Sequence, residues 1–129
     1  MVCGGREYEL EEIKRITSKV FAIVDSERTG IGKRPAENRE EFKLSCEALD
    51  IAVQLTDRRA TENYFTDEAV KAVLGENASA LGEFERLKDS SQNWSKSQHN
   101  WQIASRMTKE DIENTDIGRF LSKMFESTD

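Results

Sequence analysis

The chain has 129 residues, of which 34% are charged and 36% hydrophobic, and its formal net charge is −6 at pH 7. This length suffices for one domain with a real core, and the acidic balance disfavours generic attraction to nucleic acid or anionic lipid. Abundant Glu, Lys, Ala and Leu with a single Pro predict helices. We expect an all-α, single-domain bundle of five or six helices over 1–129, around a central helix at about 36–57, with frayed tails at 1–5 and 126–129.

Cysteine usage and the absence of targeting signals indicate an intracellular protein. Cys3 and Cys46 are the only cysteines, and two thiols without a disulfide framework fit a reducing compartment. No apolar run reaches the roughly 18 residues of a membrane span, and the acidic N-terminus lacks the apolar stretch of a signal peptide. We therefore predict a cytoplasmic protein that does not span a membrane.

The first predicted helix spans residues 6–25 and has the clearest amphipathic pattern of the chain. Charged and polar side chains occupy one face of this segment, and the opposite face is broad and apolar, formed by Leu10, Ile13, Ile16, Val20, Phe21, Ile23 and Val24. A loop at 25–35, with two glycines and the only proline, ends the helix.

The central helix is predicted from two apolar stripes in one segment. The stripes consist of Phe42, Cys46, Leu49 and Val53, and of Leu44, Ala48, Ile51 and Leu55. Neighbours within each stripe are three or four residues apart, so at about 100° per residue the two sets fall on opposite sides of one helix. A helix that is apolar on two sides packs between neighbours, which makes the segment at about 36–57 the expected hub of the bundle.

Several shorter helices are expected after residue 57. Thr66 is a predicted N-cap, and Gly75 lies where helices commonly end in glycine. A further helix is expected from Asn77. The last helix should begin near Asp116, after a capping arrangement of Thr108 with Asp111, and no segment is predicted to be a strand.

The loop that begins at Asp25 resembles the opening of an EF-hand calcium loop, through Asp25, Glu27, Thr29 and Gly30. The resemblance implies a helix–loop–helix pair. Position twelve of the loop, which is a bidentate glutamate in that family, is Ala36 here. One alternative is therefore a degenerate EF-hand-like helix pair without calcium, and the other is a turn that uses Asp and Gly for backbone reasons.

Candidate catalytic and metal-binding residues are few. His99 is the only histidine, and Cys46 lies on a predicted apolar stripe. Adjacent carboxylates such as Glu11 and Glu12 diverge by about 100° on a helix. Hydrolytic chemistry needs an oriented base beside a nucleophile, and the sequence offers no such set. We predict a non-enzymatic protein with no catalytic residues, no metal site and no cofactor.

The segment 90–109 is the best candidate for a binding surface, because it contains no carboxylate and holds both tryptophans. Aromatic rings among amide and hydroxyl groups suit a peptide-binding surface or base stacking, whereas both indoles could instead complete the core. The predicted partner-binding residues are Trp94, Lys96, Gln98, His99, Trp101 and Arg106, with Arg28, Lys33 and Arg34 as a secondary set.

The preferred functional hypothesis is a regulatory interaction module that binds a protein partner through the 90–109 segment. A second hypothesis is a homodimeric structural protein, in which the second stripe of the central helix pairs with its two-fold mate. A third is weak nucleic-acid binding through residues 88–109, which the acidic net charge disfavours. Both a monomer and a homodimer are compatible with the sequence.

Overall fold

The computed structural model describes residues 7–17 and 20–126, and it contains strands as well as helices. The elements follow the order α1 (Glu7–Ile16), β1 (Phe21–Val24), α2 (Glu37–Ala48), β2 (Ala52–Leu55), the 3-10 helix η1 (Thr61–Tyr64), α3 (Asp67–Leu74), the 3-10 helix η2 (Leu87–Asp89), α4 (Lys96–Ala104), α5 (Lys109–Ile112) and α6 (Asp116–Glu126). The expected all-α bundle is therefore wrong, because the described part of the chain is mixed α/β. The tail expected at 1–5 lies outside the described residues, as does the tail expected at 126–129 except for Glu126, which is the last residue of α6.

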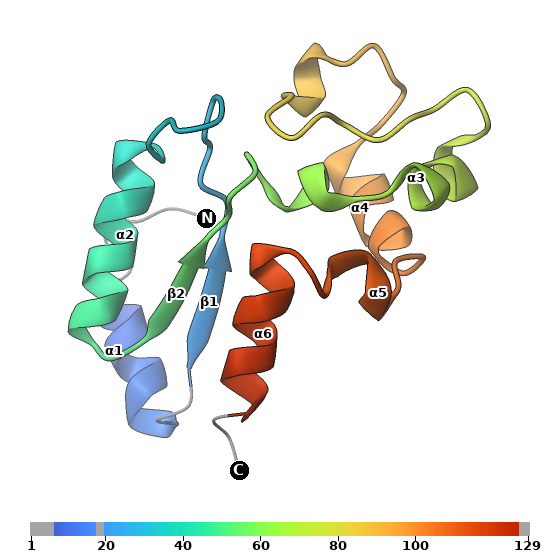
Figure 1. Ribbon diagram of the computed structural model, residues 1–129. Helices are drawn as coiled ribbons and strands as arrows, with labels where there is room; N and C mark the ends of the chain where they lie inside the picture. The colour runs from blue at the N-terminus through green and yellow to red at the C-terminus, as the bar shows by residue number, and fades with distance from the viewer. Residues whose placement is uncertain (1–6, 18–19, 127–129) are drawn as a thin grey trace.

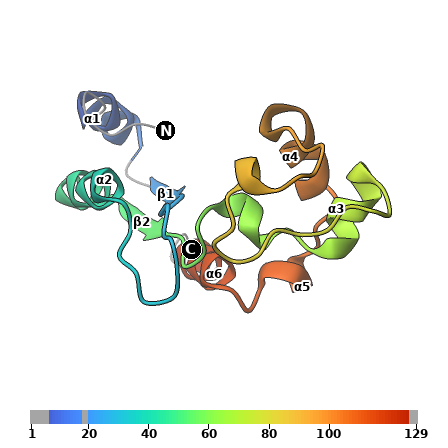
Figure 2. The ribbon, with the colours of Figure 1, turned by 90° about the horizontal axis from the view of Figure 1, so that it is seen from above.

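The two strands pair in parallel, with Phe21 opposite Ala52 and Val24 opposite Leu55. α2 connects them and covers one face of the pair, where its buried Cys46 joins a core with strand residues of both β1 and β2. On the opposite face the ring of Phe120, from α6, meets Phe21 edge-on with 5.9 Å between ring centroids. Figures 1 and 2 show the resulting layers, with α1 and α2 on one side of the strands and α6 on the other.

The first predicted helix is too long. α1 ends at Ile16, and the apolar run that follows forms β1 instead of continuing the helix. This run contains no charged residue and includes β-branched Ile23 and Val24, which suits a strand covered on both faces. The exposed fraction of Ile16 is 85%, so the supposed continuous apolar face does not form.

The central helix at about 36–57 is also wrong beyond Ala48. Asp50, with φ of 61°, reverses the chain after α2, and β2 begins two residues later. Of the stripe that contains Ile51 and Leu55, only Leu55 lies in β2, and Ile51 directly precedes the strand. A spacing of four residues fits a strand period of two as well as a helix. Leu44, from the same stripe, is 67% exposed.

A second hydrophobic cluster gathers α3, α4 and the loop between them around Val70, Trp94 and Ile103. The predicted start and end of α3 are confirmed. The Oγ1 of Thr66 accepts a hydrogen bond from the Ala69 amide at 3.2 Å, and α3 stops before Gly75, which has φ of 107°.

The helix expected from Asn77 does not form. The side-chain amide of Asn63 donates hydrogen bonds to the carbonyls of Gly82 and Glu85, at 2.7 and 2.8 Å, which holds this stretch as an irregular loop. The predicted capping of α5 by Thr108 is confirmed, as is the start of α6. Within the described ranges, no helix has both the length and the apolar character needed to cross a membrane.

Candidate functional site

The two parallel strands end side by side, and polar residues follow each of them directly. Ser26 is fully buried after β1, where its amide donates to the Oγ1 of Thr56 at 3.0 Å and its hydroxyl donates to the Arg58 carbonyl at 3.0 Å. These bonds tie the two strand ends together. In α/β proteins ligands bind outside the carboxyl ends of parallel strands, so this edge is the first place to look for a site.

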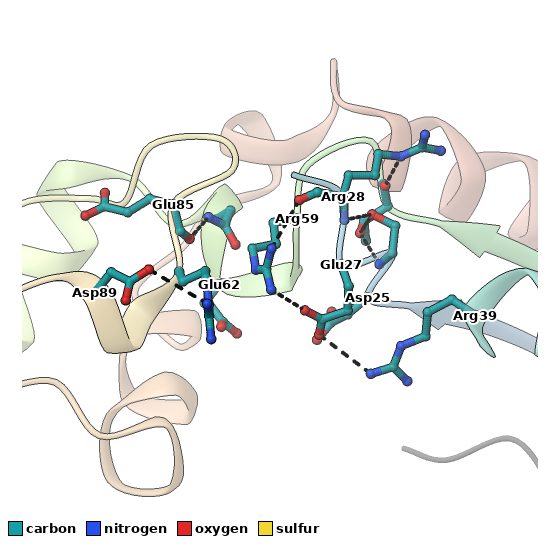
Figure 3. A network of polar contacts seen from close by, with 12 residues as sticks. Asp25, Glu27, Arg28, Arg39, Arg59, Glu62, Glu85 and Asp89 are labelled. Atoms are coloured by element: carbon teal, nitrogen blue, oxygen red, sulfur yellow. Dashed lines mark hydrogen bonds and ion pairs between the residues drawn. The ribbon is translucent and has the colours of Figure 1, made fainter. Parts of the chain in front are cut away.

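Glu27 adopts an unusual backbone conformation at this edge, with φ of 60°. The left-handed region costs a non-glycine residue roughly 1–2 kcal/mol, so surrounding contacts must hold it there. The Glu27 amide donates to the Arg59 carbonyl at 2.8 Å, and its carboxylate lies 2.9 Å from the Arg59 guanidinium and 3.6 Å from that of Arg39. Figure 3 shows this carboxylate between the two arginines.

Further hydrogen bonds position the side chains around Glu27. Arg59 is only 18% exposed and also donates to the Arg28 carbonyl at 3.4 Å. Arg28 donates through Nε to the Thr56 carbonyl at 3.1 Å. The Asp25 carboxylate accepts from the Thr61 amide at 2.9 Å. The loop after β1 is thus fastened to the segment after β2 by several independent bonds.

A second ion pair brings the α4 helix to the same edge. Glu62, on η1, is buried, and its carboxylate lies 3.1 Å from the Lys96 ammonium at the start of α4. The other carboxylate oxygen of Glu62 accepts from the Asn100 side chain at 3.5 Å. This pair links the strand ends to the second hydrophobic cluster.

A pocket of about 220 Å³ lies between these two ion pairs. It is lined by Glu27, Arg59, Ala60, Glu62, Arg86, Leu87, Lys88 and Lys96. Four of the lining residues are cationic and two are anionic, although the whole chain carries a net charge of −6. The Asp89 carboxylate is 3.9 Å from the Arg86 guanidinium, a distance at which the pair is weak. The pocket therefore presents an excess of positive charge to solvent.

The structure separates the two tryptophans that were expected to share a helical face. Trp94 lies before α4 and is 8% exposed; its indole N–H donates to the Asn100 side chain at 2.7 Å, and its ring stacks on Phe65 with 6.3 Å between centroids. Trp101 lies on α4 and is 66% exposed. One indole thus completes the core, and the other remains at the surface.

The other residues predicted around these tryptophans have different environments. Lys96 lines the pocket, whereas Gln98 and Arg106 are exposed. The Nδ1 of His99 accepts a hydrogen bond from the Ser95 amide at 2.8 Å, so the ring helps to cap α4. The structure does not bring this whole set together on one surface.

The secondary set of predicted partner-binding residues, Arg28, Lys33 and Arg34, lies in the loop between β1 and α2. Arg28 fastens this loop to the end of β2, and Lys33 is exposed. Arg34 makes two hydrogen bonds to Glu40, at 3.2 and 2.7 Å, and these bonds hold the pKa of the Glu40 carboxyl below its ordinary value.

Because a strand precedes the loop, the EF-hand-like helix pair does not form. Among the described residues no three His, Cys, Asp or Glu side chains are placed to hold a metal ion.

Most of the pocket residues were not predicted from the sequence. Glu27 entered only as part of the EF-hand resemblance, and Lys88 only as the first residue of the segment 88–109. Arg59, Glu62 and Arg86 were not identified. One usable signal was the pair of carboxylates that directly follows the apolar run of β1. The basic residues of the pocket are separated by up to 37 positions and are brought together only by the fold.

The chain matches no protein-family model, no curated protein and no solved structure. The class of the molecule therefore follows from its own geometry. It is a small mixed α/β protein with a charged pocket beside the carboxyl ends of two parallel strands.

Proposed function

We propose that this protein binds an anionic ligand that carries a phosphate group, in the pocket beside the strand ends. The observation that carries the proposal is the convergence of Arg59, Arg86, Lys88 and Lys96 on one cavity in an acidic chain. Guanidinium and ammonium groups are the donors that proteins use most for phosphate oxygens.

The basic residues of the pocket differ in whether a carboxylate holds them, and this difference supports the proposal. Arg59 and Lys96 are held by carboxylates, at 2.9 and 3.1 Å, which fixes their positions before a ligand arrives. Arg86 and Lys88 are exposed and supply the charge that the two carboxylates do not balance. A ligand phosphate in this pocket would accept hydrogen bonds from these basic groups, and preorganised donors reduce the entropy lost on binding.

Calorimetric titration with inorganic pyrophosphate at low and high salt tests this function. We expect binding that weakens as salt rises, because the contacts are charged. Arg86→Gln and Lys88→Gln should each reduce the affinity by about tenfold or more, since a hydrogen bond to a charged group contributes roughly 1.5–3 kcal/mol. Lys123→Gln, which removes an exposed charge on α6, is the matched control. Absence of binding at low salt, or an equal loss in the control, would rule out the pocket.

Binding of a protein partner is the second candidate, and the exposure of Trp101 is the observation that favours it. Large aromatic residues are enriched among the side chains that dominate interfaces. Trp101→Ala should abolish capture of a partner from a host lysate and leave the circular dichroism unchanged. Leu44→Ala, which truncates another exposed apolar side chain, is the control. Equal capture by wild type and Trp101→Ala would exclude this surface.

The proposal includes two expectations that came from the sequence: the protein is not an enzyme, and it is located in the cytoplasm. The use of His99 in capping α4 supports the first. The complete burial of the Cys46 thiol is compatible with the second. The phosphate group could alternatively belong to a nucleic acid that the protein binds weakly. A titration with single-stranded DNA distinguishes a nucleic acid from a small ligand.

A further inference from the structure

The outer edge of β1 offers main-chain groups that the sheet does not use. The Thr56 amide donates to the Val24 carbonyl at 3.1 Å, which shows which residues of β1 direct their main-chain groups toward β2. In such a ladder Ala22 and Val24 direct their N–H and C=O groups toward β2, so Phe21 and Ile23 direct theirs away from it. Within the described part of the chain, these two residues make no main-chain hydrogen bond outside the ladder.

The side chains of β1 are those of an interior strand and not of an edge. The strand reads Phe-Ala-Ile-Val and contains neither a charge nor a proline, the devices that usually protect an exposed edge. A cavity of about 300 Å³ follows this edge, lined by Ala22, Ile23, Val24 and Asp25 with Arg39, Phe42 and Thr61, and by no residue of β2. Phe21 is 38% exposed beside it.

A sheet of only two strands is small, since most sheets have about four to six strands, and it depends on the helices packed on its faces for stability. The occupant that best fits the open edge is an apolar strand whose own main-chain groups are unused. β1 of another molecule has both properties. Two identical edges related by a two-fold axis satisfy each other at once.

We infer that β1 pairs antiparallel with β1 of a second copy of this chain, which joins the two sheets into one of four strands. The outward-directed residues set the register, with Phe21 opposite Ile23 of the other copy and Ala22 opposite its own mate on the axis. This register supplies about four main-chain hydrogen bonds between copies. β2 then forms both outer edges of the joined sheet.

The side chains suit this register. Antiparallel pairing places Phe21 of one copy beside Ile23 of the other on the face covered by α6, and an aromatic residue opposite a β-branched one is a favourable pair. The small Ala22 lies on the axis, where opposite Cα atoms approach to about 4.5 Å in a pair without hydrogen bonds. The exposed ring of Phe21 would thus be covered.

Sedimentation equilibrium of the full chain, from low to high micromolar concentration, tests the inference, and a dimer is the expected result. Ile23→Pro should give a monomer with unchanged circular dichroism, because the lost N–H points away from β2. Leu44→Lys, an exposed change on α2, should leave the dimer intact. A wild-type monomer at all concentrations, or a dimer that survives Ile23→Pro, would overturn the inference.

Cross-linking tests the register without depending on the proline variant. In a Cys3→Ser background, Ala22→Cys should form an intermolecular disulfide on mild oxidation, since a Cα separation of about 4.5 Å lies within the range that disulfides accept. Phe21→Cys, on the same strand but away from the axis, should not. Failure of Ala22→Cys to cross-link, or equal cross-linking of Phe21→Cys, would contradict the β1–β1 pairing.

Discussion

Asp116 is the main polar contact between α6 and the rest of the molecule. Its Oδ1 accepts a hydrogen bond from the Tyr64 hydroxyl at 2.6 Å, and its Oδ2 accepts from the Asp57 amide and the Gln54 side chain, both at 3.0 Å. The carboxylate also lies in the first turn of α6, where the helix dipole favours a negative charge. Asp116→Ala removes all of these interactions in one change.

The expected loss follows from the number and kind of these bonds. A hydrogen bond to a charged group contributes roughly 1.5–3 kcal/mol, but three bonds to one half-buried carboxylate do not add fully. We therefore expect Asp116→Ala to lower the free energy of unfolding by about 3 kcal/mol. For a chain of this size that corresponds to a fall in Tm of about 10 °C.

Urea denaturation followed by far-ultraviolet circular dichroism measures this loss. The midpoint should fall and the m-value should stay unchanged, because the same surface is exposed on unfolding. Glu110→Ala removes an exposed carboxylate from α5 and should cost about 0.5 kcal/mol or less. A loss below about 1 kcal/mol in Asp116→Ala would refute the view that this carboxylate anchors α6.

Three further changes test other contacts. Burial raises the pKa of Tyr64 above its ordinary value of 10.0. The unfolded state therefore loses this proton first, and the free energy of unfolding of the wild type should decline above about pH 10. In Tyr64→Phe, the free energy of unfolding measured by urea denaturation should decline less between pH 8 and pH 11. Asn63→Asp replaces the buried donor to two carbonyls with a charge and should cost about 3 kcal/mol by the same method. Gly118→Ala should cost about 3 kcal/mol or more in thermal unfolding, because its Cβ would lie 2.0 Å from the Ile112 carbonyl oxygen.

The parts of the fold that were predicted correctly depend on short-range chemistry. Thr66 caps α3, and Thr108 with Asp111 caps α5, through side-chain bonds to amides three residues away. A capping bond of this kind is fixed by neighbouring residues, so it is visible in the sequence whatever the tertiary fold. The start of α6 near Asp116 was predictable for the same reason.

The strands were missed because their apolar spacing is ambiguous. Ile51, Val53 and Leu55 alternate as a strand does, yet Ile51 and Leu55 also fit a helical spacing of four. The turn that would have separated α2 from β2 contains no glycine, since Asp50 itself takes the left-handed conformation. With the usual helix-ending residue absent, the hydrophobic period alone could not locate the boundary.

The error in fold class also explains why the pocket was missed. The rule that ligands bind beyond the carboxyl ends of parallel strands applies only once β1 and β2 are recognised. Had they been, Glu27 and Arg59 would have stood out, because they follow the two strands within a few residues. Arg86 and Lys88 belong to the connection between α3 and α4, where Arg86 precedes η2 and Lys88 lies on it. The position of this loop depends on the bonds of Asn63 to distant carbonyls. No local pattern encodes such a contact, so only the folded chain shows that this loop closes the pocket.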